Sequence, residues 1–176
     1  MAARSKARKR ALDLLYACEL RGDDPVATLE QRIAEGEGPT NDYTALLVRG
    51  VAAHQGRIDE LLRAYSEGWV LERMPAIDRT ALRIGGYELL WEDDVPDPVA
   101  VSEAIALVRE LSTDDSPGFV NGVLGALLRD KDLLDLDEPE AAEEAEEAEE
   151  PQEAMVPEPA AEDHVATPAP EAEGSQ

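Results

Sequence analysis

The sequence predicts an all-α protein: a compact bundle of about seven helices, in two halves of three or four helices, followed by a disordered acidic tail. Three observations predict this fold class. Apolar residues recur with the period of a helix up to Lys131. Glycine, proline and capping residues separate the periodic segments. No segment alternates like a strand, and Asn121-Gly122 lies inside a helical pattern instead of between strands.

The first half contains three or four predicted helices. The first helix carries an apolar stripe and stops at Gly22. Asp24-Pro25 supplies a cap and a first-turn proline for a short helix that ends near Gly36. Thr40 is the predicted cap of a longer helix, and Gly56 is the predicted break before the next one. The apolar faces comprise Ala11, Leu14, Leu15 and Cys18, then Val26, Leu29 and Ile33, then Tyr43, Leu47 and Val51, then Ile58, Leu61, Leu62 and Tyr65.

The second half contains three predicted helices. The first begins at Pro75 and continues to Trp91, ahead of an acidic turn at residues 92–94. Asp97-Pro98 and Ser116-Pro117 each place a capping residue before a proline, which predicts the starts of two more helices. The apolar residues of the three helices include Ile77, Ala81 and Ile84, then Val101, Ala104, Ile105 and Val108, then Val120, Val123, Leu124 and Leu127.

The distribution of charge divides the chain at Lys131. All 16 Lys and Arg lie at or before this residue and face 23 acidic residues, so segment 1–131 has a net charge of −7. Residues 132–176 hold 17 acidic residues and no cation, which gives −17. This second segment is rich in Ala, Glu and Pro and has no aromatic residue, so it buries too little apolar surface to offset the entropy of ordering. We therefore expect a helical domain over 1–131 and a disordered acidic tail over 132–176.

Composition and motifs argue against catalysis, a metal centre and a membrane span. Cys18 is the single cysteine, so no intrachain disulfide forms. One cysteine and two histidines are also too few ligands for a Cys/His zinc cluster. No apolar run approaches the ~18 residues of a membrane helix, and no nucleotide-binding or hydrolase motif occurs. His54 has no ligand partner one turn away, so we expect a structural role for it. These features predict a cytoplasmic, non-catalytic protein without a cofactor.

The first ten residues hold a dense group of positive charges, with no acid before Asp13. Cations are unfavourable at a helix N-terminus by roughly 0.3–1 kcal/mol each, so folding alone does not ask for them. A phosphate backbone would explain them and indicates RNA or DNA binding, with a solubilising end as the alternative. We expect Arg8, Lys9 and Arg10 to lie off the apolar face of the helix. The basic cluster comprises Arg4, Lys6, Arg8, Lys9 and Arg10.

Two aromatic residues are candidates for contact with nucleic-acid bases. Tyr16 lies about two turns after the cations, at i+8 from Arg8, on a flank where a base can stack. Phe119, the single Phe of the chain, follows Ser116-Pro117-Gly118 at the start of a helix, where side chains are commonly exposed. Each aromatic residue has an alternative interpretation as an ordinary packing residue.

Several segments, taken in order, resemble the NusB family of transcription antitermination factors. The start ARSKARKRALDLLYACE is similar to the arginine-rich first helix of that family. AIDRTALRIGGYELL at residues 76–90, followed by DVPDPVAVSEAIALVREL and SPGFVNGVLGALL, is similar to its C-terminal half. The resemblance covers about residues 3–131 and leaves out the tail.

The resemblance implies a non-catalytic adaptor that binds boxA-type single-stranded RNA together with NusE, a small-subunit ribosomal protein. It also implies a place in the transcription elongation complex during ribosomal RNA synthesis. By position, the RNA-binding residues would be Arg4, Lys6, Arg8, Lys9, Arg10, Tyr16, Asp115 and Phe119. The residues at the NusE interface would be Asp78 and, bordering both surfaces, Tyr16.

Two alternatives stay open from the sequence. NusB-like domains also occur at the front of certain RNA cytosine methyltransferases, although residues 132–176 hold no cofactor-binding domain. The second alternative is a structural homo-oligomer, with a homodimer as its simplest form. The acidic tail has two interpretations of its own, a spacer without contact to the body or a competitor with RNA for the basic cluster.

Overall fold

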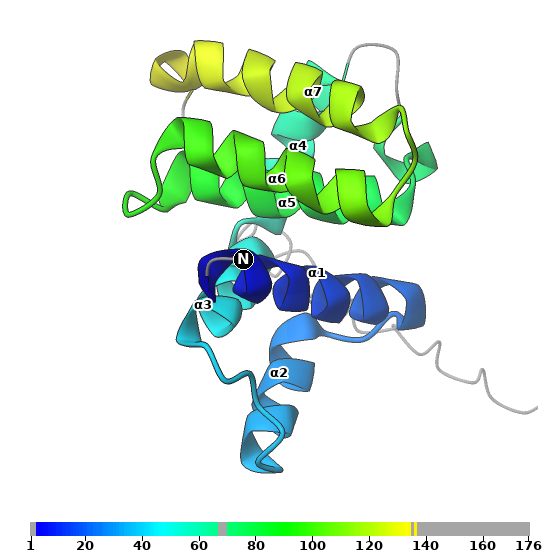
Figure 1. Ribbon diagram of the computed structural model, residues 1–176, viewed down its shortest axis with the longest axis vertical. Helices are drawn as coiled ribbons and strands as arrows, with labels where there is room; N and C mark the ends of the chain where they lie inside the picture. Colours follow the sequence, from blue (N-terminus) through cyan, green and yellow to red (C-terminus); the bar gives the residue numbers. More distant parts are fainter. Residues whose placement is uncertain (1–2, 67–69, 135, 137–176) are drawn as a thin grey trace, which may run out of the picture. The chain divides into compact units, whose positions relative to one another are not determined.

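The computed structural model describes residues 3–66, 70–134 and 136 of the chain (Figure 1). These residues form seven α-helices and two short 3-10 helices and contain no strand, so the predicted all-α class is confirmed. The α-helices are α1 (Ala3–Arg21), α2 (Pro25–Ala34), α3 (Asp42–Ala53), α4 (Gln55–Tyr65), α5 (Ala76–Trp91), α6 (Asp97–Leu111) and α7 (Ser116–Asp130). The 3-10 helices are η1 (Leu71–Arg73) and η2 (Lys131–Leu133).

The helices form two groups that meet at α5. Figure 1 shows α5, α6 and α7 stacked together with α4 behind them, whereas α1, α2 and α3 form the other group. Helix α5 packs against α4, α6 and α7 in its own group and against α1 and α3 in the other. Because it has neighbours on both sides, α5 is buried from Thr80 to Leu90 with Arg83 as the single exception. The two groups thus hold three and four helices, and the prediction that α4 belongs to the first half is wrong, because α4 packs against α5 and α7.

The ends of α1 and α2 follow the predicted signals. Gly22 follows α1 with a φ of 72°, a left-handed conformation that glycine adopts at little cost. Gly36 follows α2 with a φ of 77°. The Asp24 carboxylate accepts a hydrogen bond from the backbone N–H of Ala27 at 2.7 Å, so Asp24 caps α2 as expected.

Two predicted boundaries in the first half are wrong by one or two residues. Asn41, and not Thr40, caps α3, because its side chain accepts the hydrogen bond from the Tyr43 N–H. Gly56 does not break the chain between α3 and α4. His54 does so, and Gly56 lies within the first turn of α4.

The predicted caps of α6 and α7 are also displaced by one residue. Asp97 and Ser116 are the first helical residues, and neither residue makes a capping hydrogen bond to the backbone of its own helix. The prolines that follow them still lie in the first turn, where a missing N–H costs nothing. The Ser116 hydroxyl instead donates to Asp78 on α5.

The packed body continues past Lys131. Helix η2 covers Lys131–Leu133, and Leu134 and Leu136 are partly buried against the apolar core. Of the predicted tail over 132–176, residues 135 and 137–176 lie outside the described residues. No helix in the described part of the chain has the length and apolar character needed to cross a membrane.

The close approach of α3 to α5 depends on Gly50. A Cβ atom added at this position would lie 2.1 Å from Cζ of Tyr87, whose ring is 8% exposed. Tyr87 has little room to retreat, because its ring stacks with those of Trp91 and His54. A side chain at position 50 therefore forces the two helices apart.

We expect Gly50→Ala to lower the free energy of unfolding by about 1–3 kcal/mol, the usual cost of overpacking. The matched control is Gly125→Ala on α7, where an added Cβ meets nothing within 4 Å. Because alanine favours a helix interior by roughly 1 kcal/mol over glycine, the control should raise stability. Urea denaturation of both variants checks the two signs. Equal effects would contradict the steric explanation.

Candidate nucleic-acid interface

The basic cluster starts α1, but its five side chains do not share one environment. Arg4, Lys6 and Arg10 are exposed, Lys9 is partly buried, and Arg8 is 2% exposed. Three cations are therefore fully exposed to a ligand, and a fourth, Lys9, is partly exposed. The expectation that Arg8 lies off the apolar face of α1 is wrong.

Arg8 is buried because it forms an ion pair inside the molecule. Its Nε donates to both carboxylate oxygens of Glu88 on α5, at 2.8 and 2.9 Å. Its Nη1 lies 3.2 Å from Oε2 of Glu103 on α6. The Tyr43 hydroxyl also donates to Glu88, whose exposed fraction is 1%. Arg8 thus links α1 to α5 and α6 through a charged pair that excludes solvent.

The electrostatics of this pair favour the charged guanidinium. Burial disfavours the charge of Arg8, but the hydrogen bonds and negative charge of Glu88 outweigh burial and raise the pKa of Arg8. Burial, together with the neighbouring Glu88 carboxylate, raises the pKa of Tyr43 well above its usual range. Tyr43 therefore stays a neutral hydrogen-bond donor, and Arg8 stays charged.

The other members of the basic cluster lie around the outer faces of α1. The Arg4 guanidinium lies 4.8 Å from the centre of the Tyr43 ring and donates to the Asp94 carbonyl. Lys9 pairs with Glu110 on α6. Arg10 and Lys6 lie one turn apart on a flank of α1 that differs from those of Arg4 and Lys9. Arg10 donates to the Thr40 hydroxyl at 2.8 Å, and Lys6 has no ion pair among the described residues.

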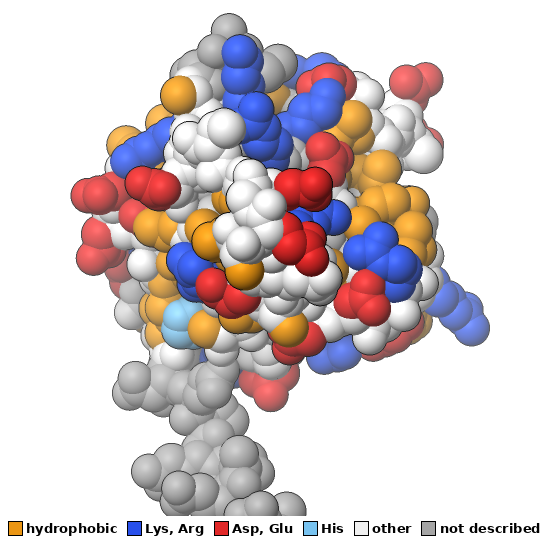
Figure 2. Space-filling view, turned by 90° about the horizontal axis from the view of Figure 1, so that it is seen from below, with side chains coloured by type: hydrophobic (Ala, Val, Ile, Leu, Met, Phe, Trp, Pro, Cys, Tyr) orange, Lys and Arg blue, Asp and Glu red, His pale blue; other side chains and the backbone are white. Residues whose placement is uncertain are grey.

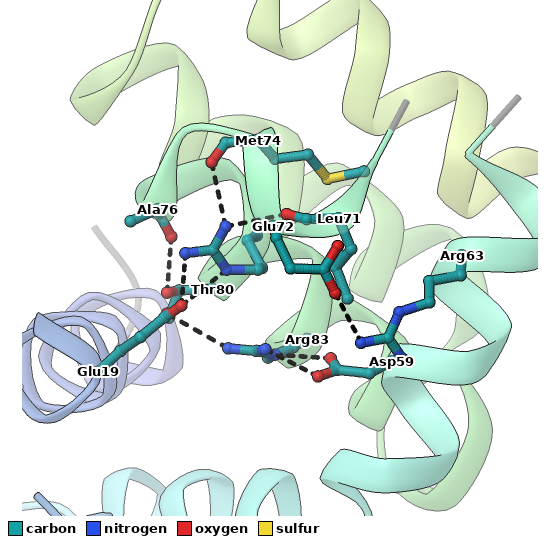
Figure 3. A network of polar contacts seen from close by, with 10 residues as sticks. Glu19, Asp59, Arg63, Leu71, Glu72, Met74, Ala76, Thr80 and Arg83 are labelled. Carbon is teal, nitrogen blue, oxygen red and sulfur yellow. Dashed lines mark hydrogen bonds and ion pairs between the residues drawn. The ribbon is translucent and has the colours of Figure 1, made fainter. Parts of the chain in front are cut away.

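The C-terminal half of α1, which carries the partly buried Tyr16, is held by the polar network in Figure 3. Arg83 on α5 donates to both oxygens of Asp59 on α4, at 2.7 and 2.8 Å. The same guanidinium donates to Glu19 on α1 at 3.2 Å. The network therefore fixes this end of α1 against α4 and α5.

Arg79 extends the same network to the segment that joins α4 and α5. Its guanidinium donates to Glu19 at 2.7 Å and to the carbonyl oxygens of Leu71 and Met74 at 2.9 and 3.1 Å. This role does not follow from the pattern of apolar residues. The available signal is a pair of arginines one turn apart, Arg79 and Arg83, in a helix that is mostly buried.

Asp78 lies beneath the surface, with an exposed fraction of 3%. One carboxylate oxygen, Oδ2, accepts the hydrogen bond from Ser116 at 2.7 Å, and the other has no hydrogen-bond partner among the described residues. Ser116 also contacts the hydroxyl of Thr113 at 2.8 Å. Asp78 therefore joins the start of α5 to the start of α7, and in this structure it is not an exposed interface residue.

Asp115 and Phe119 lie at the start of α7, as the sequence indicated. Asp115 is exposed, and Phe119 is partly buried beside a cavity of about 430 Å³ that Tyr65 and Arg129 also line.

The structure separates the two groups of predicted RNA-binding residues along α5. The Arg8–Glu88 pair places the basic cluster near the C-terminal end of α5, and the Asp78–Ser116 bond places the start of α7 near its N-terminal end. Ten residues separate Asp78 from Glu88, which corresponds to about 15 Å along a helix. A ligand that touches both groups must therefore be extended.

His54 has the structural role expected from the sequence. Its ring stacks on that of Trp91, with centroids 4.4 Å apart and planes inclined by 13°.

In the space-filling view of Figure 2, positive and negative side chains are interspersed, with no large area of one sign. Electrostatic recognition on this face therefore depends on individual side chains.

The comparisons with known proteins identify the family. The family model for NusB matches residues 5–129. The chain belongs to the NusB family. The transcription antitermination protein NusB of Nocardioides sp. is 70% identical over 131 residues, which cover 74% of this chain and 97% of that protein. NusB of Beutenbergia cavernae is 63% identical over 139 residues, covering 73% and 91%.

Solved structures give the same assignment. NusB of T. maritima superposes with a TM-score of 0.64 at 31% identity, covering 76% of this chain and 99% of that one. A NusB in a crystal structure with NusE and double-stranded RNA has a TM-score of 0.62 at 27% identity, covering 72% and 96%. Membership in the NusB family makes this chain a transcription antitermination factor and not an enzyme.

Proposed function

We propose that this NusB family member is a cytoplasmic RNA-binding adaptor that acts in the transcription elongation complex during ribosomal RNA synthesis. It binds boxA-type single-stranded RNA together with NusE. The observation that carries the proposal is the exposed positive charge at the start of α1, where Arg4, Lys6 and Arg10 face solvent. Cations at a helix N-terminus do not help the protein to fold, but they do attract the negative charge of a phosphate backbone.

The RNA-binding residues that we propose have two kinds of role. Arg4, Lys6, Lys9 and Arg10 contact phosphates, and Tyr16, Asp115 and Phe119 contact bases or sugars further along the strand. Arg8 has a positioning role, because its guanidinium is bound to Glu88 inside the molecule. The accessible cations of the basic cluster thus depend on Arg8 for the placement of α1.

The proposed contact with NusE involves the opposite end of α1. Tyr16 lies on the helix that Glu19 ties to Arg79 and thereby to the segment before α5. Asp78 is buried and precedes Arg79 on α5, so it would act on this surface only indirectly, by joining α5 to α7 through its bond to Ser116. A structurally similar NusB has been solved in complex with NusE and double-stranded RNA, which supports NusE as the partner.

The proposal is tested by titrating labelled boxA-type RNA and a scrambled RNA of the same composition with the full chain, with and without NusE. Fluorescence anisotropy should show tighter binding of the boxA-type RNA in the presence of NusE. Equal affinities for the two RNAs in both conditions would contradict the proposal. Sedimentation of the same samples separates an RNA-binding adaptor from a structural homo-oligomer.

The relatives named above do not favour the methyltransferase alternative. The relatives from Nocardioides sp. and Beutenbergia cavernae are matched over 97% and 91% of their own length. Each of these relatives is therefore a protein of about this domain's size.

A further inference from the structure

A groove lies between α1 and the segment that joins α2 to α3, on the flank of α1 that carries Arg10. Its cavity volume is about 480 Å³, within the range of pockets that hold small molecules. Its lining residues come from α1, α2, the connecting segment and α3. They are Arg10, Asp13 and Leu14, then Arg32, then Glu37, Gly38, Pro39 and Thr40, then Thr44.

Two arginines from different helices line this groove. Arg10 comes from α1, and its bond to the Thr40 hydroxyl at 2.8 Å holds the guanidinium beside the connecting segment. Arg32 comes from the last turn of α2, is exposed, and has no ion pair among the described residues. Three other exposed arginines of the described residues, Arg21, Arg49 and Arg63, do pair with a carboxylate. The charge of Arg32 is therefore available to a ligand.

The groove continues the exposed part of the basic cluster. Lys6 and Arg10 are one turn apart on α1, so a strand that follows their charges reaches the groove. Leu14 and Pro39 give the groove an apolar part on which a base can pack. Asp13 and Glu37 supply acceptors for a base amino group or a ribose hydroxyl.

We propose that this groove binds a nucleotide of the single-stranded RNA that flanks the boxA-type core. The phosphate side of this nucleotide faces Arg10 and Arg32, and its base packs beside Leu14 and Pro39. The inference rests on the proposed function, since it extends the RNA path from α1 toward α2. It adds Arg32, a residue that neither the sequence pattern nor the family resemblance marked as functional.

The test compares a core RNA with the same core extended by several uridines at either end. Arg32→Ala should weaken binding of one extended RNA several-fold and leave the core RNA unchanged. Because single strands lose about 0.7 log units of affinity per log unit of salt for each phosphate contact, the defect should shrink about 2.6-fold between 50 and 200 mM salt. Arg73→Ala is the matched control, an exposed arginine beside α5 that should have no effect.

Removing a carboxylate from the groove should have the opposite effect on RNA affinity to removing Arg32. Glu37→Gln removes a negative charge from the groove and should tighten binding of the extended RNA several-fold at low salt. Both variants are at exposed positions, and circular dichroism verifies that they fold.

The outcomes separate this inference from the proposed function. If the wild-type protein binds the core RNA but Arg32→Ala and Arg73→Ala bind the extended RNA equally, the groove proposal is overturned and the proposed function stands. If the wild-type protein binds neither RNA, both fail. An extension-dependent loss in Arg32→Ala alone supports the groove.

Discussion

Arg8→Ala is expected to lower the free energy of unfolding by about 3–5 kcal/mol, because it leaves a buried carboxylate without its partner. Glu88 is 1% exposed and receives two hydrogen bonds from Arg8. The Tyr43 hydroxyl alone remains to compensate its charge after the substitution. The loss should be measurable as a lower urea midpoint of the chemical unfolding curve.

Two further variants identify the cause of this loss. Arg8→Ala/Glu88→Gln removes the uncompensated charge and should recover part of the lost stability. Arg10→Ala, on the exposed side of the same helix, should change stability by less than about 0.5 kcal/mol. If the double variant is no more stable than Arg8→Ala, the loss comes from packing of the arginine side chain and not from the buried charge.

The fold was largely predictable because helices are indicated by local patterns in the sequence. The spacing of Leu14, Leu15 and Cys18 defines the buried face of α1, and all three are buried as expected. Helix ends were less predictable where two adjacent residues compete for one role. Thr40 and Asn41 are both capable caps, and the Thr40 hydroxyl instead accepts the hydrogen bond of Arg10, a residue thirty positions away.

The division of the basic cluster was only partly predictable. Arg8 precedes Ala11 by three residues and Leu15 by seven, so the helical period places it on the buried stripe. The same period leaves Lys6 on the outer face. What the sequence does not reveal is the buried Glu88, eighty residues later, whose charge allows an arginine to enter the core. Without a known partner, an exposed Arg8 is the expected position, because burying an unpaired charge costs much free energy.

The position of Asp78 was unpredictable for a related reason. An acid in the first turn of a helix is favourable next to the helix dipole and is usually solvated, so its type and place agree with an exposed role. Its burial follows from the approach of α7, which brings the Ser116 hydroxyl within 2.7 Å. Only the tertiary packing of two helix starts decides this contact.

Lys6→Ala/Arg10→Ala is expected to leave the fold intact and to cause a large loss of RNA affinity. Both side chains are exposed, and neither pairs with a carboxylate among the described residues. With Arg8 buried, four cations of the cluster remain for phosphates, so the slope of log affinity against log salt should be about −2.8. The double variant should reduce it to about −1.4, at 0.7 per contact.

The control for this prediction is Arg63→Ala/Arg73→Ala, which removes the same charge from exposed positions on α4 and η1. A long-range effect of net charge would weaken RNA binding equally in both double variants, and it would do so mainly at low salt, since the Debye length is about 8 Å at physiological ionic strength. Direct phosphate contact at α1 changes the slope in the first variant only. If the slope of Lys6→Ala/Arg10→Ala equals that of the wild type, the phosphates are bound elsewhere on the molecule, and α1 loses its place as the RNA-binding helix.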